Sequence, residues 1–150
     1  MSPNRIALAL GTLSLVLIAG ALYFQYVLGY PPCEMCWWQR YPHFAAILVG
    51  IGGGLLVRDA QAARIVALLT ILCVALSGAI AVYHAGVEWH WWKGPSACTG
   101  GPYNGPLDLN KKVVLCDIAA WRFLGISLAG YNAIASLGAA ALGFIAWLRK

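Results

Sequence analysis

The stretch IALALGTLSLVLIAGALYFQY, residues 6–26, contains 21 residues and no charged side chain. A bilayer core is about 30 Å thick, and roughly 20 apolar residues in an α-helix are enough to cross it. The run exceeds the apolar core of about 7–15 residues found in a cleaved signal peptide, although Ala19-Gly20-Ala21 resembles a cleavage site. We therefore predict that residues 6–26 form a membrane-spanning helix that is retained in the chain.

Three other segments have the same character. They are residues 37–57, which contain Arg40 near their start, 65–83 and 123–148. The whole chain is 61% hydrophobic and 10% charged, whereas soluble domains average about 45–50% and 25%. With no repeat or linker in the sequence, we predict one all-α integral membrane domain over residues 1–150, a bundle of four transmembrane helices. Its two longer loops are residues 27–36 and 84–122.

Positive charges indicate how such a bundle is oriented. Five lie on the side of the two termini and five on the other side, but the first five are concentrated in shorter segments. The two groups are Arg5, Arg58, Arg64, Arg149 and Lys150, and Arg40, Lys93, Lys111, Lys112 and Arg122. Because Lys and Arg concentrate on the cytoplasmic side, we expect both termini in the cytoplasm. No basic cluster indicates binding to nucleic acid.

Four of the five cysteines lie in the two loops on the opposite, non-cytoplasmic side, where disulfides persist. Cys33 and Cys36 are three residues apart, and a disulfide that closes so small a loop adds little stability. Cys98 and Cys116 enclose a longer loop, which a structural disulfide would stabilise more. Their wide spacing disfavours a zinc site made of all four thiolates, and Trp37 stands where a haem attachment motif requires histidine.

The segment PPCEMCWWQR, residues 31–40, has the features of a redox centre. The two prolines suit a helix that begins directly after them, so Cys36 falls in the first turn, where the helix dipole favours a thiolate. Arg40 lies four residues further along the same face. It either returns its charge to the membrane interface or stabilises this thiolate and the anion formed on an electron acceptor. Trp37 and Trp38 are either interfacial aromatics or walls for a flat, lipid-soluble ring such as a quinone.

The second loop begins with GVEWHWWKGPSAC, residues 86–98, which we predict to be a short interfacial helix ending at Gly94-Pro95. Cys98 is followed by the glycine- and proline-rich stretch TGGPYNGP, residues 99–106, which predicts an open loop. A disulfide exposed in such a loop would be labile and suited to exchange with another protein. The chain thus offers one cysteine pair near lipid and one near water.

Other residues inside the apolar segments predict helix packing rather than chemistry. Gly50 and Gly54 are four residues apart, a spacing that lets two membrane helices approach closely. Asn132 predicts a hydrogen bond between helices. We interpret Cys73, in the third apolar segment, as an inert buried thiol.

Four stretches together resemble the DsbB family of membrane oxidases, which regenerate the disulfide of a soluble thioredoxin-fold oxidant. They are PPCEMCWWQRYPH (31–43), YHAGVEW (83–89), GPSACTG (94–100) and CDIAAWRFLGISLAGYN (116–132). The resemblance implies that Cys33 and Cys36 are the quinone-linked pair, with Cys36 nearest the quinone, and that Arg40 helps to bind it. It also implies that Cys98 forms the mixed disulfide with the soluble partner. Cys116 is then the cysteine that pairs with Cys98 and exchanges with Cys33.

The same resemblance implies a location and partners for the chain. His84 corresponds to a histidine at the loop entry, although a polar cap on the third apolar segment is an equal alternative. The implied acceptor is ubiquinone or menaquinone, the implied partner a DsbA-like protein, and the location a bacterial inner membrane with both cysteine loops in the periplasm. No metal is expected. Two alternatives stay open: an enzyme like vitamin K epoxide reductase, and a non-enzymatic membrane protein with structural disulfides.

Overall fold

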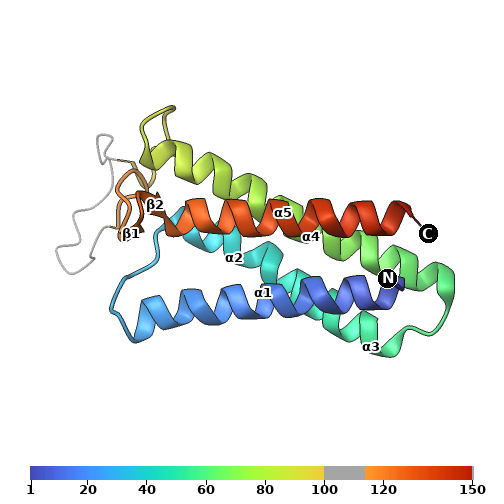
Figure 1. Cartoon of the computed structure of the whole chain (residues 1–150). Coiled ribbons are helices and arrows are strands. Elements are labelled where there is room, and N and C mark those ends of the chain that lie inside the picture. Colours follow the sequence, from blue (N-terminus) through green and yellow to red (C-terminus); the bar gives the residue numbers. More distant parts are fainter. Residues whose placement is uncertain (100–113, 150) are drawn as a thin grey trace.

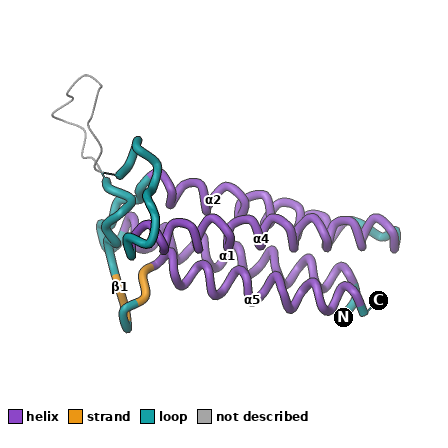
Figure 2. Tube along the Cα trace, turned by 90° about the horizontal axis from the view of Figure 1, so that it is seen from above, coloured by secondary structure: helices purple, strands orange, loops and turns teal. Residues whose placement is uncertain are grey.

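The computed structural model describes residues 1–99 and 114–149, which form four helical rods lying side by side (Figures 1 and 2). The N- and C-termini lie at one end of the bundle, and the loops that carry the cysteines lie at the other (Figure 1). The second rod consists of three consecutive helical segments. The helices are α1 (Pro3–Tyr26), α2 (Glu34–Ile47), η1 (Leu48–Gly53), α3 (Gly54–Leu56), α4 (Ala60–Glu88) and α5 (Leu128–Leu148).

Three of these helices are long and apolar enough to cross a membrane within the part of the chain that the structure describes. They are α1, α4 and α5, with mean hydropathies of 2.2, 2.7 and 1.5. The second rod is interrupted because η1 has the wider hydrogen-bonding pattern of a π-helix, and α2 contains Pro42. The chain is therefore a mostly helical, multi-pass membrane protein.

Close packing of the first two rods depends on glycine, as the spacing of Gly50 and Gly54 predicted. A Cβ atom on Gly50 would lie 2.7 Å from the carbonyl oxygen of Ala7 and 3.0 Å from the Cα of Gly11, both in α1. A Cβ atom on Gly54 would lie 2.7 Å from the side chain of Leu8. The prediction of close helix packing is confirmed, and small residues let the two backbones touch.

The third apolar segment extends further than predicted. Instead of ending at Tyr83, α4 continues to Glu88, because His84 and Glu88 are buried and have partners inside the bundle. The stretch GVEWHWWK is therefore no separate interfacial helix: its first three residues complete α4, and turns follow from Trp89. Residues 100–106 of the predicted open loop lie outside the described residues.

The last helix begins later than the predicted segment 123–148. Residues 122–127 form a small antiparallel hairpin of β1 (Arg122–Phe123) and β2 (Ile126–Ser127). Its two-residue turn has positive φ at Leu124 (50°) and Gly125 (81°), which a helix cannot accommodate. Ser127 then caps α5 by accepting a hydrogen bond from the backbone N–H of Gly130. This hairpin holds the start of α5 against the cysteine-bearing end of the bundle.

Candidate active site

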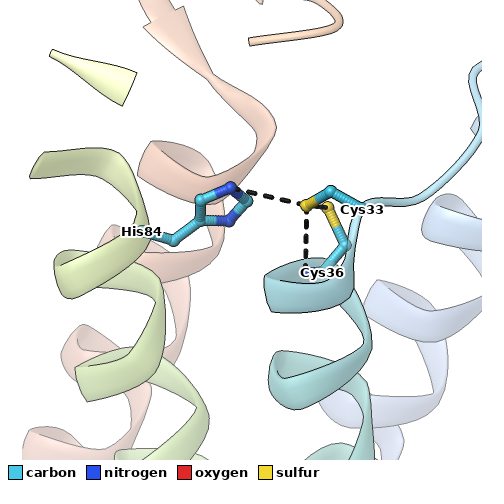
Figure 3. Close-up of side chains that lie close together, drawn as sticks. All are labelled: Cys33, Cys36 and His84. Carbon is cyan, nitrogen blue, oxygen red and sulfur yellow. Dashed lines mark hydrogen bonds between the residues drawn. The ribbon is translucent and has the colours of Figure 1, made fainter. Parts of the chain in front are cut away.

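Cys33 and Cys36 lie together at the start of α2 (Figure 3). Their sulfur atoms are 2.8 Å apart. Cys33 is the N-cap of the helix, and its sulfur accepts a hydrogen bond from the backbone N–H of Cys36 at 3.2 Å. The prediction that the helix begins here is confirmed, and Cys36 occupies the first turn, where the helix dipole favours negative charge.

The two thiols differ in their surroundings. Cys33 is buried, whereas Cys36 is partly exposed. The hydrogen bond between the two sulfur atoms raises the pKa of Cys33, and burial of its side chain raises it further. Cys33 therefore holds the proton of the pair, and the thiolate forms on Cys36.

Arg40 is buried one helical turn after Cys36. Its guanidinium donates hydrogen bonds to Gln25 Oε1 at 2.6 Å and to the carbonyl oxygen of Ala21 at 3.4 Å, both in α1. It also lies over the ring of Trp37, 4.8 Å from the ring centroid. In the described ranges, no carboxylate lies within ion-pair distance of Arg40. Its positive charge is thus left to neutralise an anion that forms at the site.

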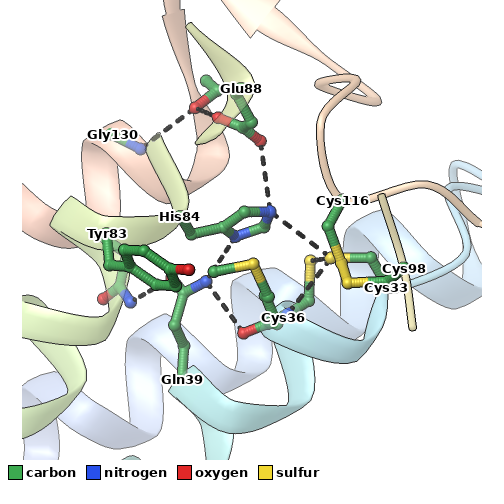
Figure 4. Close-up of polar contacts among 12 residues, drawn as sticks. Cys33, Cys36, Gln39, Tyr83, His84, Glu88, Cys98, Cys116 and Gly130 are labelled. Carbon is green, nitrogen blue, oxygen red and sulfur yellow. Dashed lines mark hydrogen bonds and ion pairs between the residues drawn. A yellow bond between two sulfur atoms is a disulfide. The ribbon is translucent and has the colours of Figure 1, made fainter. Parts of the chain in front are cut away.

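Cys98 and Cys116 form a disulfide, with their Cα atoms 5.3 Å apart. The sequence predicted an exposed disulfide, and this is wrong: Cys98 is 5% exposed and Cys116 is completely buried. Both belong to one packed cluster with Cys33, Met35 and Val87. The two cysteine pairs therefore meet inside the protein, at the start of α2 (Figure 4).

His84 faces Cys33 (Figure 3) and lies where the two cysteine pairs meet (Figure 4). It is 2% exposed, and its Nε2 atom lies 3.6 Å from the sulfur of Cys33. The same atom is 3.7 Å from Oε1 of Glu88, one turn later in α4. Ser127 Oγ donates a hydrogen bond to the other oxygen of this carboxylate. His84 is thus part of the site, although the sequence alone left a simple polar cap as an equal alternative.

An apolar cavity of about 390 Å³ adjoins these residues, within the usual size range of small-molecule sites, about 300–1,000 Å³. Cys36, Arg40, His84 and Glu88 line it. Its apolar lining comes mainly from α1, α5 and the segments before α2 and β1, and includes Val16, Leu17, Ile18, Phe24, Tyr30, Trp121, Leu128, Tyr131 and Ala135. A partly exposed sulfur and an unpaired cation therefore face a largely apolar space.

The structure does not bring all the predicted residues to this cavity. Trp37 and Trp38 are each 36% exposed and are not among the residues that line it. Aromatic walls are supplied instead by Phe24 and Trp121, whose ring centroids are 5.0 Å apart, and by Tyr131. Sequence reasoning missed this because Phe24 and Trp121 are 97 residues apart and meet only in the folded chain.

Two further polar residues of the site, Gln39 and Glu88, were not predicted. Gln39 is buried, lines the cavity and donates a hydrogen bond to His84 Nδ1 at 2.8 Å. The spacing of His84 and Glu88, four residues apart, is a signal that they share a helix face. Because the predicted helix ended at Tyr83, both residues were assigned to a loop, where a spacing of four residues does not indicate a shared face.

Cys33, Cys36 and His84 also offer three metal-ligand atoms that lie within 4.8 Å of one another. Thiolate sulfur and imidazole nitrogen are ligands that zinc takes. The spacing thus allows a metal ion, and the absence of a metal from this protein stays a prediction.

A multi-pass helical membrane protein with a buried disulfide packed against a second cysteine pair belongs to the class of membrane thiol–disulfide oxidoreductases. Comparison with known proteins supports the same class. The model of the family described as disulfide bond formation protein DsbB matches residues 3–146. The chain belongs to the DsbB family, and its role is disulfide bond formation in a membrane.

Individual relatives agree with the family match. Disulfide bond formation protein B of Pasteurella multocida is 34% identical over 77% of this chain and 68% of its own length. Disulfide bond formation protein B 2 of Pseudomonas aeruginosa is 34% identical over 84% of this chain and 78% of its own. Disulfide bond formation protein B of a Polaromonas species is 28% identical over 95% of this chain and 89% of its own length. No solved structure matches the chain.

Proposed function

We propose that this protein oxidises a soluble, DsbA-like dithiol protein and passes two electrons to a membrane quinone. One observation carries the proposal: the buried Cys98–Cys116 disulfide packs against Cys33, while Cys36 faces an apolar cavity. Electrons that enter at the loop disulfide thus reach the cavity by exchange between neighbouring sulfur atoms. A structural disulfide needs neither the second pair nor the cavity.

The residues around the cavity fit a quinone. Its ring and tail are apolar and suit the aliphatic and aromatic lining, and its carbonyl oxygens become negative as the ring is reduced. Arg40 is the residue that would hold such an oxygen and neutralise its charge, and Phe24, Trp121 and Tyr131 would hold the ring. When bound, a quinone supplies the acceptor for two electrons and two protons. Both ubiquinone and menaquinone have this chemistry.

The thiol chemistry begins when a thiolate of the partner attacks Cys98. The Cys98–Cys116 bond breaks, and its electron pair stays on Cys116 as a thiolate. In the oxidised form of the site, Cys33 and Cys36 are also joined by a disulfide. Cys116 then attacks Cys33, which breaks the Cys33–Cys36 bond and leaves the electron pair on Cys36. The helix dipole and Arg40 stabilise the Cys36 thiolate, so it is a good leaving group.

The site is then restored in two exchanges. The second thiolate of the partner attacks the partner sulfur bound to Cys98, so the oxidised partner leaves and Cys98 becomes a thiolate. Cys98 attacks Cys116, which restores the loop disulfide and releases Cys33 as a thiolate. Cys33 and Cys36 finally form their disulfide again, and the two electrons go to the quinone that the cavity would hold.

The bundle supports a proposal for the arrangement in the membrane. We propose that the rod of α2, η1 and α3 is the second of four spans, because it lies alongside α1 and α4 (Figure 1). Both termini then face the cytoplasm, and the cysteine end faces the periplasm of a bacterium. Oxidising conditions on that side suit the reaction.

Purified protein mixed with a reduced thioredoxin-fold oxidant and ubiquinone tests the proposal through the loss of quinone absorbance. We expect loss with the wild type and none with Cys36→Ser. Cys73→Ser is the matched control, because Cys73 is the unbonded cysteine that lies outside the site: it is half-buried in α4 and does not line the cavity. No loss with the wild type, or equal loss with Cys36→Ser, would exclude a thiol:quinone oxidase. Reduction of a quinone epoxide in its place would identify an enzyme like vitamin K epoxide reductase.

A further inference from the structure

A chain of buried and partly buried hydrogen bonds runs through the bundle and ends at His84. Ser14 of α1 donates to His43 Nδ1 in α2 at 3.0 Å, and His43 Nε2 donates to Asn132 Oδ1 in α5 at 3.1 Å. Asn132 Nδ2 donates to Gln39 Oε1 at 2.9 Å, and Gln39 Nε2 donates to His84 Nδ1 in α4 at 2.8 Å. All four rods contribute, so the prediction of an interhelical hydrogen bond by Asn132 is confirmed. These hydrogen bonds also share one donor-to-acceptor direction.

The direction is fixed first at Gln39. The side-chain nitrogen of Gln39 lies 3.1 Å from the carbonyl oxygen of Met35. A carbonyl oxygen only accepts, so this end of the amide is the NH₂ group. The second hydrogen of the same group points at His84 Nδ1. His84 Nδ1 therefore accepts, and in the neutral imidazole the proton resides on Nε2.

The direction is fixed again at Asn132. The hydroxyl of Ser77 donates to the backbone carbonyl oxygen of Gln39 at 2.8 Å, so its oxygen is left to accept from Asn132 Nδ2 at 3.3 Å. The amide nitrogen of Asn132 therefore faces Gln39 as well. Its oxygen accepts from His43 and from Ser136 Oγ at 2.8 Å. Two independent acceptors, the carbonyl oxygen of Met35 and the hydroxyl oxygen of Ser77, thus give the same direction. Along the whole chain from Ser14, each donor group lies on the side nearer to His84.

We propose that Asn132 is a positioning residue, which acts through Gln39 to hold His84 in its Nε2–H tautomer. The Nε2 atom lies 3.6 Å from the sulfur of Cys33 and 3.7 Å from Oε1 of Glu88, and His84 also has a hydrogen bond with the backbone of Cys116. If the protein works as proposed above, this tautomer matters at the step that releases Cys33 as a thiolate. When Cys98 attacks Cys116, the Cys116–Cys33 bond breaks and its electron pair goes to Cys33, where the Nε2–H group stabilises the new negative charge. The opposite tautomer would present a lone pair to this thiolate.

The test observes the tautomer directly in the intact protein in detergent micelles. Histidine labelled with ¹⁵N gives distinct shifts for protonated and unprotonated ring nitrogens, and His84→Gln assigns the signals of His84. We expect a protonated Nε2 in the wild type. Gln39→Glu has the same shape but places an oxygen opposite Nδ1, so the proton should move to Nδ1. A wild type with protonated Nδ1, or a Gln39→Glu protein whose His84 signals are unchanged, would overturn the proposal.

Asn132→Leu tests Asn132 itself, which does not touch His84 but does line the cavity. Without the donor to Gln39 Oε1, the Met35 carbonyl oxygen alone orients the Gln39 amide. We therefore expect the ratio of the Nε2–H to the Nδ1–H tautomer of His84 to fall about tenfold, because losing one hydrogen bond has an effect of this order. We also expect kcat to fall in proportion to the fraction of His84 that keeps the Nε2–H tautomer. Should Asn132→Leu fail to fold, Gln39→Glu still decides the question.

Thr70→Val is the matched control. Thr70 is completely buried in α4, and its hydroxyl donates to the carbonyl oxygen of Val66 in the same helix at 2.8 Å. Its loss removes one hydrogen bond within α4 and should leave the His84 signals and kcat unchanged. Identical His84 spectra in Asn132→Leu and wild type would reduce Asn132 to a structural contact. A wild type that holds the Nε2–H tautomer but does not reduce quinone would refute the proposed function and leave the positioning role intact.

Discussion

Replacing Gly50 by alanine tests whether contact between helix backbones stabilises this membrane protein. The new methyl carbon would lie 2.7 Å from the carbonyl oxygen of Ala7, where ordinary contact begins at 3.4 Å. It would also meet Thr70 Cγ2 at 2.8 Å and Gly11 Cα at 3.0 Å. Two of the three neighbours are backbone atoms of α1, which cannot rotate away. The helices must separate by about the missing 0.7 Å (3.4 − 2.7).

Gly52→Ala is the matched control, because no atom lies within 4 Å of the position of its Cβ. Both changes remove a glycine from the same helical segment, so both gain about 1 kcal/mol of helix propensity. Only Gly50→Ala also overpacks the interface, at a cost of about 1–3 kcal/mol. We therefore expect the free energy of unfolding of Gly50→Ala to be about 1–3 kcal/mol below that of Gly52→Ala.

The assay is unfolding by sodium dodecyl sulfate in mixed micelles, followed by circular dichroism at several detergent ratios. Both variants and the wild type are compared at the same protein concentration and lipid content. Free energies of unfolding for the two alanine variants that agree within about 0.5 kcal/mol, the spread of harmless substitutions, would refute close backbone contact between α1 and η1.

Three further predictions concern the site. Arg40→Ala should raise KM for ubiquinone about tenfold in steady-state assays, since a charge-assisted contact is lost; an equal rise in KM for the soluble partner would contradict this role. Trp121→Ala should weaken quinone binding, measured by titration of the bound absorbance, whereas Trp38→Ala should not; the reverse order would restore the original prediction. In protein reduced at both pairs, iodoacetamide should label Cys36 well before Cys33, because Cys33 is buried and its pKa is raised. Mass spectrometry of peptides measures the order, and faster labelling of Cys33 would count against it.

The membrane fold and the reactive pair were readable from local features of the chain. Length and apolar composition predicted the helices now seen as α1, α4 and α5. Pro31 and Pro32 predicted the helix start that places Cys36 in the first turn and Arg40 beside it. These features depend only on neighbours within a turn or two, so they survive in any fold that keeps the segment helical.

The errors share one physical cause. Hydropathy scores each side chain by itself and takes no account of its partners in the folded chain. The polar residues His84 and Glu88 were therefore left out of the third predicted helix. The apolar Leu124 and the neighbouring Gly125 were included in the fourth. In the structure, Glu88 is satisfied by Ser127, 39 residues away, and a turn with positive φ separates the hairpin strands. A partner so distant in sequence leaves no local signal.

The sequence by itself determined that this is a helical membrane protein with a reactive cysteine pair, because apolar run length and helix-start chemistry are local properties. Only the tertiary structure decided that the loop disulfide is buried against Cys33, and that Phe24 and Trp121 wall the cavity. It also decided that a chain of hydrogen bonds, with links such as Asn132 to Gln39 across 93 residues, orients His84. In apolar surroundings each buried polar group must find a partner. The partners that do so come from whichever helices the bundle brings together.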